Sequence, residues 1–98
     1  MKSGAYVYIL TNRVRGTLYI GATTDLVARI YQHRTGAVKG FTEKYKLRRL
    51  VFCEMYDDLD GAFMRERQLK KWNRDWKVGL IERDNPNWDD LYPTIAIP

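Results

Sequence analysis

Four side chains in the first third of the sequence have the chemistry to act on a phosphate ester: the phenols of Tyr8 and Tyr19, the guanidinium of Arg29 and the imidazole of His33. A guanidinium binds phosphate oxygens in a bidentate manner and stays charged throughout the pH range of proteins. A neutral imidazole moves a proton near pH 7. Arg29 and His33 are four residues apart, so on a helix they lie on one face. The spacing predicts a site that binds a phosphate and transfers a proton beside it.

The two tyrosines are predicted to lie on the paired strands of a hairpin. Residues Ala5–Thr11 and 17–23 are rich in aromatic and β-branched side chains, and polar turn residues at 12–16 separate them. Pairing of the strands brings the two phenols near each other. Gly21 lacks a side chain near the end of the second strand, which would let a phosphate backbone approach closely. Tyrosine is also common in strands for packing alone, and this interpretation stands beside the chemical one.

A helix carrying Arg29 and His33 is predicted to begin at Thr24 or Asp25 and to stop at Gly36. Apolar residues between these limits recur with a helical rather than a strand period. The remaining predicted elements are a short helical turn at 41–45, a strand at Arg49–Tyr56, a long helix from a cap at Asp58 or Asp60 to Trp72 or Asn73, and a helix at 76–82 that ends at Asp84-Asn85-Pro86. From Asn87 the tail is expected to lie over the surface, anchored by Trp88, Leu91 and Tyr92.

The predicted order β-β-α-β-α-α indicates a small α/β (α+β) fold in which helices flank a three-stranded antiparallel sheet. The 98-residue chain has no linker or repeat, so residues 1–98 are expected to form a single domain. No apolar run is long enough to cross a membrane and no signal-peptide pattern is seen, which predicts a cytoplasmic protein. The single cysteine, Cys53, agrees with a reducing compartment, and its apolar neighbours favour a buried side chain over a nucleophile.

Lys and Arg outnumber Asp and Glu by 17 to 12, which gives a formal net charge of +5 at pH 7. This excess favours a polyanionic partner, since each neutralised phosphate releases counterions. A basic run that includes Lys70, Lys71 and Arg74 either follows the backbone of a nucleic acid or is a solvated helix end. The three tryptophans are expected to pack the core rather than to stack on bases.

Two short motifs in this arrangement resemble those that name the GIY-YIG nucleases. They are Tyr6-Val7-Tyr8 and Tyr19-Ile20-Gly21, followed by Arg29 and His33. The likeness continues in the second long helix, at Ala62, Arg65-Glu66 and Leu69-Lys70-Lys71-Trp72, where the metal-binding glutamate of the family falls on Glu66. It covers nearly the whole chain and is greatest for stand-alone single-domain endonucleases related to the incision domain of the excinuclease C subunit. Tyr6 departs from the motif, which has glycine there.

The resemblance implies phosphodiester hydrolysis with one divalent cation, Mg²⁺ or Mn²⁺, held by Glu66 as its only protein ligand. A hard ion that keeps several waters suits a single carboxylate. Tyr8 or Tyr19 would orient or deprotonate the attacking water, and Arg29 would stabilise charge on the phosphorus. His33 would carry a proton or contact a phosphate.

The family also has an asparagine after the glutamate, for which Asn73, Asn85 and Asn87 compete. Asn87 is favoured on the expectation that the tail folds back toward the sheet. Gly21, Lys70, Lys71 and Arg74 are the expected nucleic-acid contacts.

The resulting hypothesis is an endonuclease that cuts DNA, in the repair or processing of structured or single-stranded substrates. RNA is the alternative substrate, because nothing in the sequence distinguishes a 2′-hydroxyl. One site per chain predicts nicking by a monomer and cleavage of both strands only by a homodimer. Two rival functions remain: a nucleic-acid-binding module that is inactive or needs a protein partner, and a protein-interaction domain that binds no DNA.

Overall fold

The computed structural model describes residues 4–96. Its three strands are β1 (Ala5–Thr11), β2 (Leu18–Thr23) and β3 (Arg49–Tyr56), paired antiparallel in the order β2-β1-β3. The predicted three-stranded antiparallel sheet is therefore confirmed. The first strand lies in the centre of the sheet and is buried on both faces, which explains its nearly continuous apolar sequence.

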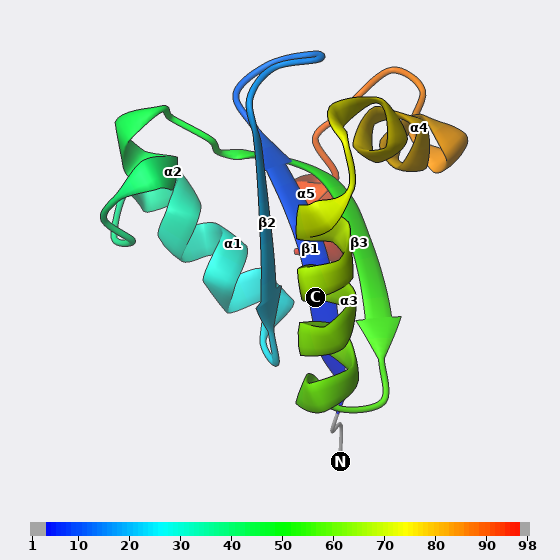
Figure 1. Ribbon diagram of the computed structural model, residues 1–98. Helices are drawn as coiled ribbons and strands as arrows, with labels where there is room; N and C mark the ends of the chain where they lie inside the picture. Colours follow the sequence, from blue (N-terminus) through cyan, green and yellow to red (C-terminus); the bar gives the residue numbers. More distant parts are fainter. Residues whose placement is uncertain (1–3, 97–98) are drawn as a thin grey trace.

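Helices cover both faces of the sheet (Figure 1). They are α1 (Leu26–Thr35), α2 (Phe41–Lys44), α3 (Leu59–Lys71), α4 (Arg74–Asp84) and α5 (Tyr92–Ile95). On one face, Val7 and Ile9 pack with Ala62 and Leu69 of α3. On the other face, apolar residues of the sheet pack with the buried residues of α1, in a cluster formed by Tyr8, Leu10, Leu26, Ile30, Leu47 and Leu50. The sheet thus separates two apolar layers. No helix among residues 4–96 has the length and apolar character to span a bilayer.

Side-chain caps set the ends of the two helices on which the predicted site depends. Asp25 is the N-cap of α1, and its carboxylate accepts a hydrogen bond of 3.2 Å from the backbone amide of Ala28. Gly36 ends the helix with a left-handed φ of 79°. Asp58, rather than Asp60, caps α3. These caps hold Arg29, His33 and Glu66 within regular helical turns.

The predicted helix at 76–82 is too short, because α4 begins at Arg74. The side chain of Asn73 accepts a hydrogen bond of 2.9 Å from the amide of Trp76 and so starts the helix earlier.

The predicted anchors of the tail do pack on the sheet: Trp88 is fully buried, and Leu91 and Tyr92 pack against the cluster that contains Tyr8. The indole of Trp88 donates to Glu82 at 2.7 Å, and its carbonyl accepts from Arg49 at 3.0 Å. The tail forms part of the core and adds the short helix α5, which the sequence analysis missed.

Candidate active site

The ring of Tyr8, on β1, lies across the neighbouring strand β2 at the position of Gly21. Tyr8 and Gly21 face each other in the β1–β2 register. A Cβ atom added at Gly21 would lie 2.5 Å from Cζ and 2.5 Å from Oη of Tyr8. The ring of Tyr8 therefore occupies the space in which a phosphate backbone was expected to approach. The structure gives Gly21 a different reason to be glycine, since any larger residue would displace the phenol.

Replacing Gly21 by alanine is expected to destabilise the fold by about 1–3 kcal/mol, since the ring of Tyr8 must move. The same variant is expected to lose the phosphodiester hydrolysis that the family resemblance implies. Gly79→Ala is the matched control, because Gly79 lies within α4 and a Cβ there meets nothing within 4 Å. That control should stabilise the protein by roughly 0.4–1 kcal/mol. Urea unfolding of both variants measures the difference, and equal stabilities would contradict the proposed contact.

A buried chain of polar groups connects Tyr8 to α1 and α2. The hydroxyl of Tyr8 lies 3.2 Å from Nε2 of His33, and Nδ1 of His33 lies 3.0 Å from Oγ1 of Thr42. Tyr8 is only 1% exposed, His33 2% and Thr42 4%. Burial, and then the positive charge of Arg29, lowers the pKa of His33 to about 4. His33 is therefore neutral at pH 7, with one nitrogen that donates and one that accepts.

The low pKa of His33 makes the stability of the protein depend on pH. An unfolded histidine titrates near pH 6.5, so below this pH the unfolded chain binds more protons than the folded one. The free energy of unfolding is expected to fall by about 2 kcal/mol as the pH is lowered from 7 to 5. Urea unfolding at several pH values measures this, and His33→Asn should remove most of the dependence.

The chain contains only one histidine, so its imidazole signals can be followed in an NMR titration without ambiguity. Titration of the folded protein near pH 6.5 would contradict the burial of His33.

Tyr19 completes a group of three rings. The ring centroids of Tyr8 and Tyr19 are 6.3 Å apart, and that of His33 lies 5.9 Å from Tyr8 and 5.7 Å from Tyr19. All three pairs are tilted, as is common for packed aromatic side chains. Tyr19 is only half-buried, unlike Tyr8 and His33. Of the two phenols, Tyr19 is the one that solvent reaches.

Arg29 and Glu66 act on the same phenol from opposite layers of the fold. Burial raises the pKa of Tyr8 well above its usual value, and the nearby Tyr19 and Glu66 raise it further. Arg29 opposes these effects through its charge and a hydrogen bond to Tyr8. Arg29 belongs to α1 and Glu66 to α3, and β2 lies between these helices in Figure 1. The structure thus brings the five predicted residues Tyr8, Tyr19, Arg29, His33 and Glu66 together around β2.

The composition of this cluster suits a hard cation that retains most of its water. Its only carboxylate is that of Glu66, whose side chain is 17% exposed, and the remaining ligands of the ion would be water and phosphate oxygens. Residues 4–96 contain no group of three or more His, Cys, Asp or Glu side chains that would form a closed metal cage. Lys70 Nζ lies 2.8 Å from Glu66 Oε2, but Lys70 is half-exposed. Such a surface ion pair contributes only about 0–1 kcal/mol and would yield to a divalent cation.

The predicted asparagine is not brought to the cluster. Asn87 is exposed and stands between Asn85 and Trp88, which bind β3 at the edge of the sheet opposite to β2. Asn85 is buried and donates to the carbonyls of Val51 and Asp89 at 3.1 and 2.9 Å. Asn73 caps α4. The tail does fold back onto the sheet, but at the wrong edge.

Asn85 and Asn87 are therefore expected to behave differently on replacement. Asn85→Ala should lower the free energy of unfolding by about 1–3 kcal/mol, because buried hydrogen-bonding groups lose their partners. Asn87→Ala should change it by less than about 0.5 kcal/mol, as for other exposed sites. Chemical denaturation checks both values. A loss of cleavage by Asn87→Ala with unchanged stability would instead place Asn87 in the site.

The predicted nucleic-acid contacts on α3 and α4 differ in how free their side chains are to bind a ligand. Lys70 pairs with Glu66, and Lys71 is exposed on α3. Arg74 is used within the fold, since it donates to the carbonyls of Arg15 and Gly16 at 2.6 and 2.8 Å. Thr42 was missed, because a threonine in a short helical turn carries no sequence signal of its contact with His33.

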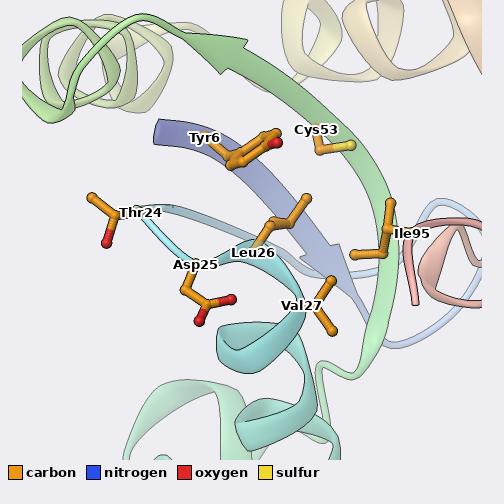
Figure 2. A pocket seen from close by; sticks show the side chains of 7 residues that line it. All are labelled: Tyr6, Thr24, Asp25, Leu26, Val27, Cys53 and Ile95. Carbon is orange, nitrogen blue, oxygen red and sulfur yellow. The ribbon is translucent and has the colours of Figure 1, made fainter. Parts of the chain in front are cut away.

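A separate pocket of about 430 Å³ lies where the N-terminal end of α1 meets β1, β3 and α5 (Figure 2). None of the five clustered residues lines it. Its lining is largely apolar and includes Cys53, whose pKa is raised by burial. A thiol with a raised pKa is a poor nucleophile, in agreement with the structural role expected for Cys53.

Comparison with known proteins shows similarity to the GIY-YIG catalytic domain over most of the chain. The family model of the GIY-YIG catalytic domain matches residues 4–78. A UPF0213 protein of Syntrophus aciditrophicus is 38% identical over 80 residues, which are 81% of this chain and 91% of the relative. A UPF0213 protein of Staphylococcus saprophyticus is 34% identical over 76 residues, or 78% and 92% of the two chains. The solution structure of the UPF0213 protein BH0048 from Bacillus halodurans has a TM-score of 0.55 and 29% identity, covering 89% of this chain and 92% of that one. This chain belongs to the GIY-YIG nuclease family.

Proposed function

We propose that this protein is a metal-dependent endonuclease that hydrolyses phosphodiester bonds in DNA, and that it processes structured or single-stranded DNA in repair. The observation that carries the proposal is the meeting of five side chains around β2. They come from four elements, β1, β2, α1 and α3, that are separate in the sequence. Packing alone does not require a buried imidazole, a guanidinium and a carboxylate around one phenol.

Glu66 is the residue that would hold Mg²⁺ or Mn²⁺, as a single carboxylate ligand. When bound, the cation supplies positive charge beside the phosphate oxygens and activates water. The remaining chemistry falls to side chains of the cluster.

The two tyrosines have different roles in this proposal. Tyr19, the half-exposed phenol, orients the attacking water. Tyr8 is buried, and its hydroxyl donates to Nε2 of the neutral His33, so its phenol oxygen is fixed as a hydrogen-bond acceptor within the site. In that arrangement Nδ1–H of His33 donates to Oγ1 of Thr42, which holds the tautomer that accepts at Nε2. Thr42 is therefore a positioning residue.

Arg29 binds the phosphate and stabilises the charge that develops on it. Its location on α1 beside Tyr8 allows one side chain to act on both the phosphate and the phenol. A guanidinium suits this role because it presents several donors in a fixed plane.

Incubation of the protein with supercoiled, single-stranded and branched DNA, in Mg²⁺ or Mn²⁺, tests the proposal. Cleavage should exceed that of a Glu66→Ala control and cease when EDTA is added. Nicked rather than linear product is expected from supercoiled DNA, because a monomer carries one site. Salt-dependent binding without turnover would favour a binding module that needs a partner. No binding at low salt would overturn the nucleic-acid function altogether.

A further inference from the structure

A groove of about 480 Å³ lies between α3 and α4, outside the catalytic cluster. The residues that line it are Met64, Arg67, Gln68, Lys71, Trp72 and Trp76. None of them belongs to the five residues of the site. We refer to this surface as the α3–α4 groove.

The α3–α4 groove contains a tryptophan, Trp76, whose side chain is largely exposed. Trp76 is 60% exposed, whereas Trp88 in the same chain is completely buried. The rings of Trp72 and Trp76 meet edge to face, with centroids 5.8 Å apart. The guanidinium of Arg65 lies over the ring of Trp72, 5.2 Å from its centre. Trp76 therefore packs against Trp72 while most of its side chain stays open to a ligand.

The charge of the α3–α4 groove favours an anionic ligand. Arg67 and Lys71 contribute two cations, and no carboxylate lines the groove. Within residues 4–96, neither cation forms an ion pair, in contrast to Arg65 and Lys70 on the same helix. A flat aromatic surface beside unpaired cations matches the base and the phosphate of a nucleotide.

Exposed cations connect the groove with the catalytic cluster around α3. Successive helical residues are rotated by about 100°. Measured from Glu66, Lys70, Arg67 and Lys71 therefore follow at roughly 40°, 100° and 140° around the helix. These cations form a row over the exposed side of α3, which leads from Glu66 to Trp72. A helix is only about 10–12 Å across with its side chains, so a few nucleotides span this distance.

The N-terminal end of α3 has the opposite charge. Asp57, Asp58 and Asp60 are all exposed there. A polyanion is repelled from that end, so its path crosses the C-terminal half of the helix, where the cations and the tryptophans are located.

We propose that the α3–α4 groove binds single-stranded nucleic acid next to the scissile phosphate. Trp76 stacks on an unpaired base, and Arg67 and Lys71 bind the flanking phosphates. Single strands are favoured over duplexes because a base must be unstacked to offer its face to a tryptophan. This inference rests on the proposed function and assigns its substrate class.

Fluorescence anisotropy with a labelled oligo(dT) and with a labelled duplex tests the proposal, in EDTA so that no cleavage occurs. Trp76→Ala is expected to weaken oligo(dT) binding by about 5- to 100-fold, the usual loss for one stacked base. Duplex binding should change much less. Trp76→Phe should restore most of the affinity, because phenylalanine retains a ring face. Tyr31→Ala is the matched control, since Tyr31 is 58% exposed on α1, outside the groove; it should bind like the parent protein.

The two cations are tested by the salt dependence of binding. The double variant Arg67→Ala/Lys71→Ala should lower the slope of log K against log[salt] by roughly 1.4 for a single strand, the value for two phosphate contacts. Circular dichroism verifies that each variant is folded. Unchanged oligo(dT) binding by Trp76→Ala would overturn the proposal and leave the groove to a protein partner. An equal loss for duplex and single strand would overturn the assignment of single strands as the substrate class.

The binding assay separates this proposal from the proposed function. If the parent protein cuts DNA but Trp76→Ala binds oligo(dT) normally, the groove assignment is wrong and the nuclease stands. If no DNA is cut but binding depends on Trp76, the groove assignment holds and the nuclease proposal fails.

Discussion

Glu66→Gln is expected to reduce DNA cleavage by about 100- to 1000-fold, the usual effect of removing one group that stabilises charge in a transition state. The substitution keeps the size of the side chain and removes its negative charge. Stability should change by less than about 1 kcal/mol, because the ion pair with Lys70 is at the surface. Cleavage rates measured over a range of Mg²⁺ concentrations give the size of the effect and show whether added metal restores activity.

Asp60→Asn is the matched control for Glu66→Gln. It also neutralises a carboxylate of α3, but Asp60 is exposed in the first turn of the helix, before the turn that carries Glu66. This control should cleave within about twofold of the parental rate, because the loss of one exposed carboxylate changes only a screened, long-range charge. If both variants cleave at the parental rate, Glu66 does not hold the metal.

Arg29→Ala is expected to reduce cleavage by about 100- to 1000-fold through loss of charge stabilisation at the phosphate. Arg29→Lys keeps the charge but not the planar arrangement of donors, so it should recover only part of the loss. A second measurement follows from the structure. Because Arg29 helps to lower the pKa of His33, Arg29→Ala should raise that pKa from about 4 toward the usual value.

NMR titration of the single histidine detects this shift without a substrate. Arg83→Ala is a suitable control, since Arg83 pairs with Asp84 at the exposed end of α4. It should leave both the cleavage rate and the pKa of His33 unchanged. An unchanged pKa in Arg29→Ala would mean that Arg29 does not face the imidazole. An unchanged cleavage rate would remove Arg29 from the proposed mechanism.

The strands and the main helices were predictable because their signals are local. The aromatic and β-branched content of residues 5–11 and 49–56 predicts strands, and both appear with these bounds. Each helix start was predicted as one of two neighbouring polar residues, and the structure selects Asp25 and Asp58 as the caps. The tail was harder, because the burial of Trp88 depends on contacts with Arg49 and Glu82, which no local pattern reveals.

The candidate site was also largely predictable, but only as a set of residues. An ordered series of two tyrosines, an arginine, a histidine and a later glutamate carries a family resemblance without any coordinates. Their proximity could not be derived from spacing, because Glu66 and Arg29 belong to opposite layers. The sequence also did not show why residue 21 is glycine, because the ring that it accommodates, that of Tyr8, belongs to the neighbouring strand.

The sequence by itself therefore determined the strands, the main helices, the family resemblance and the chemical types at the site. The tertiary structure decided how residues of the same type differ in their surroundings. Trp88 packs in the core, while Trp76 is exposed. Asn85 is buried, while Asn87 faces solvent. The tertiary structure also joined Thr42 to His33 and left Tyr19, of the two tyrosines, open to water. The physical reason is that residue type sets what a side chain can do, whereas burial and long-range partners set its ionisation and its access to a ligand.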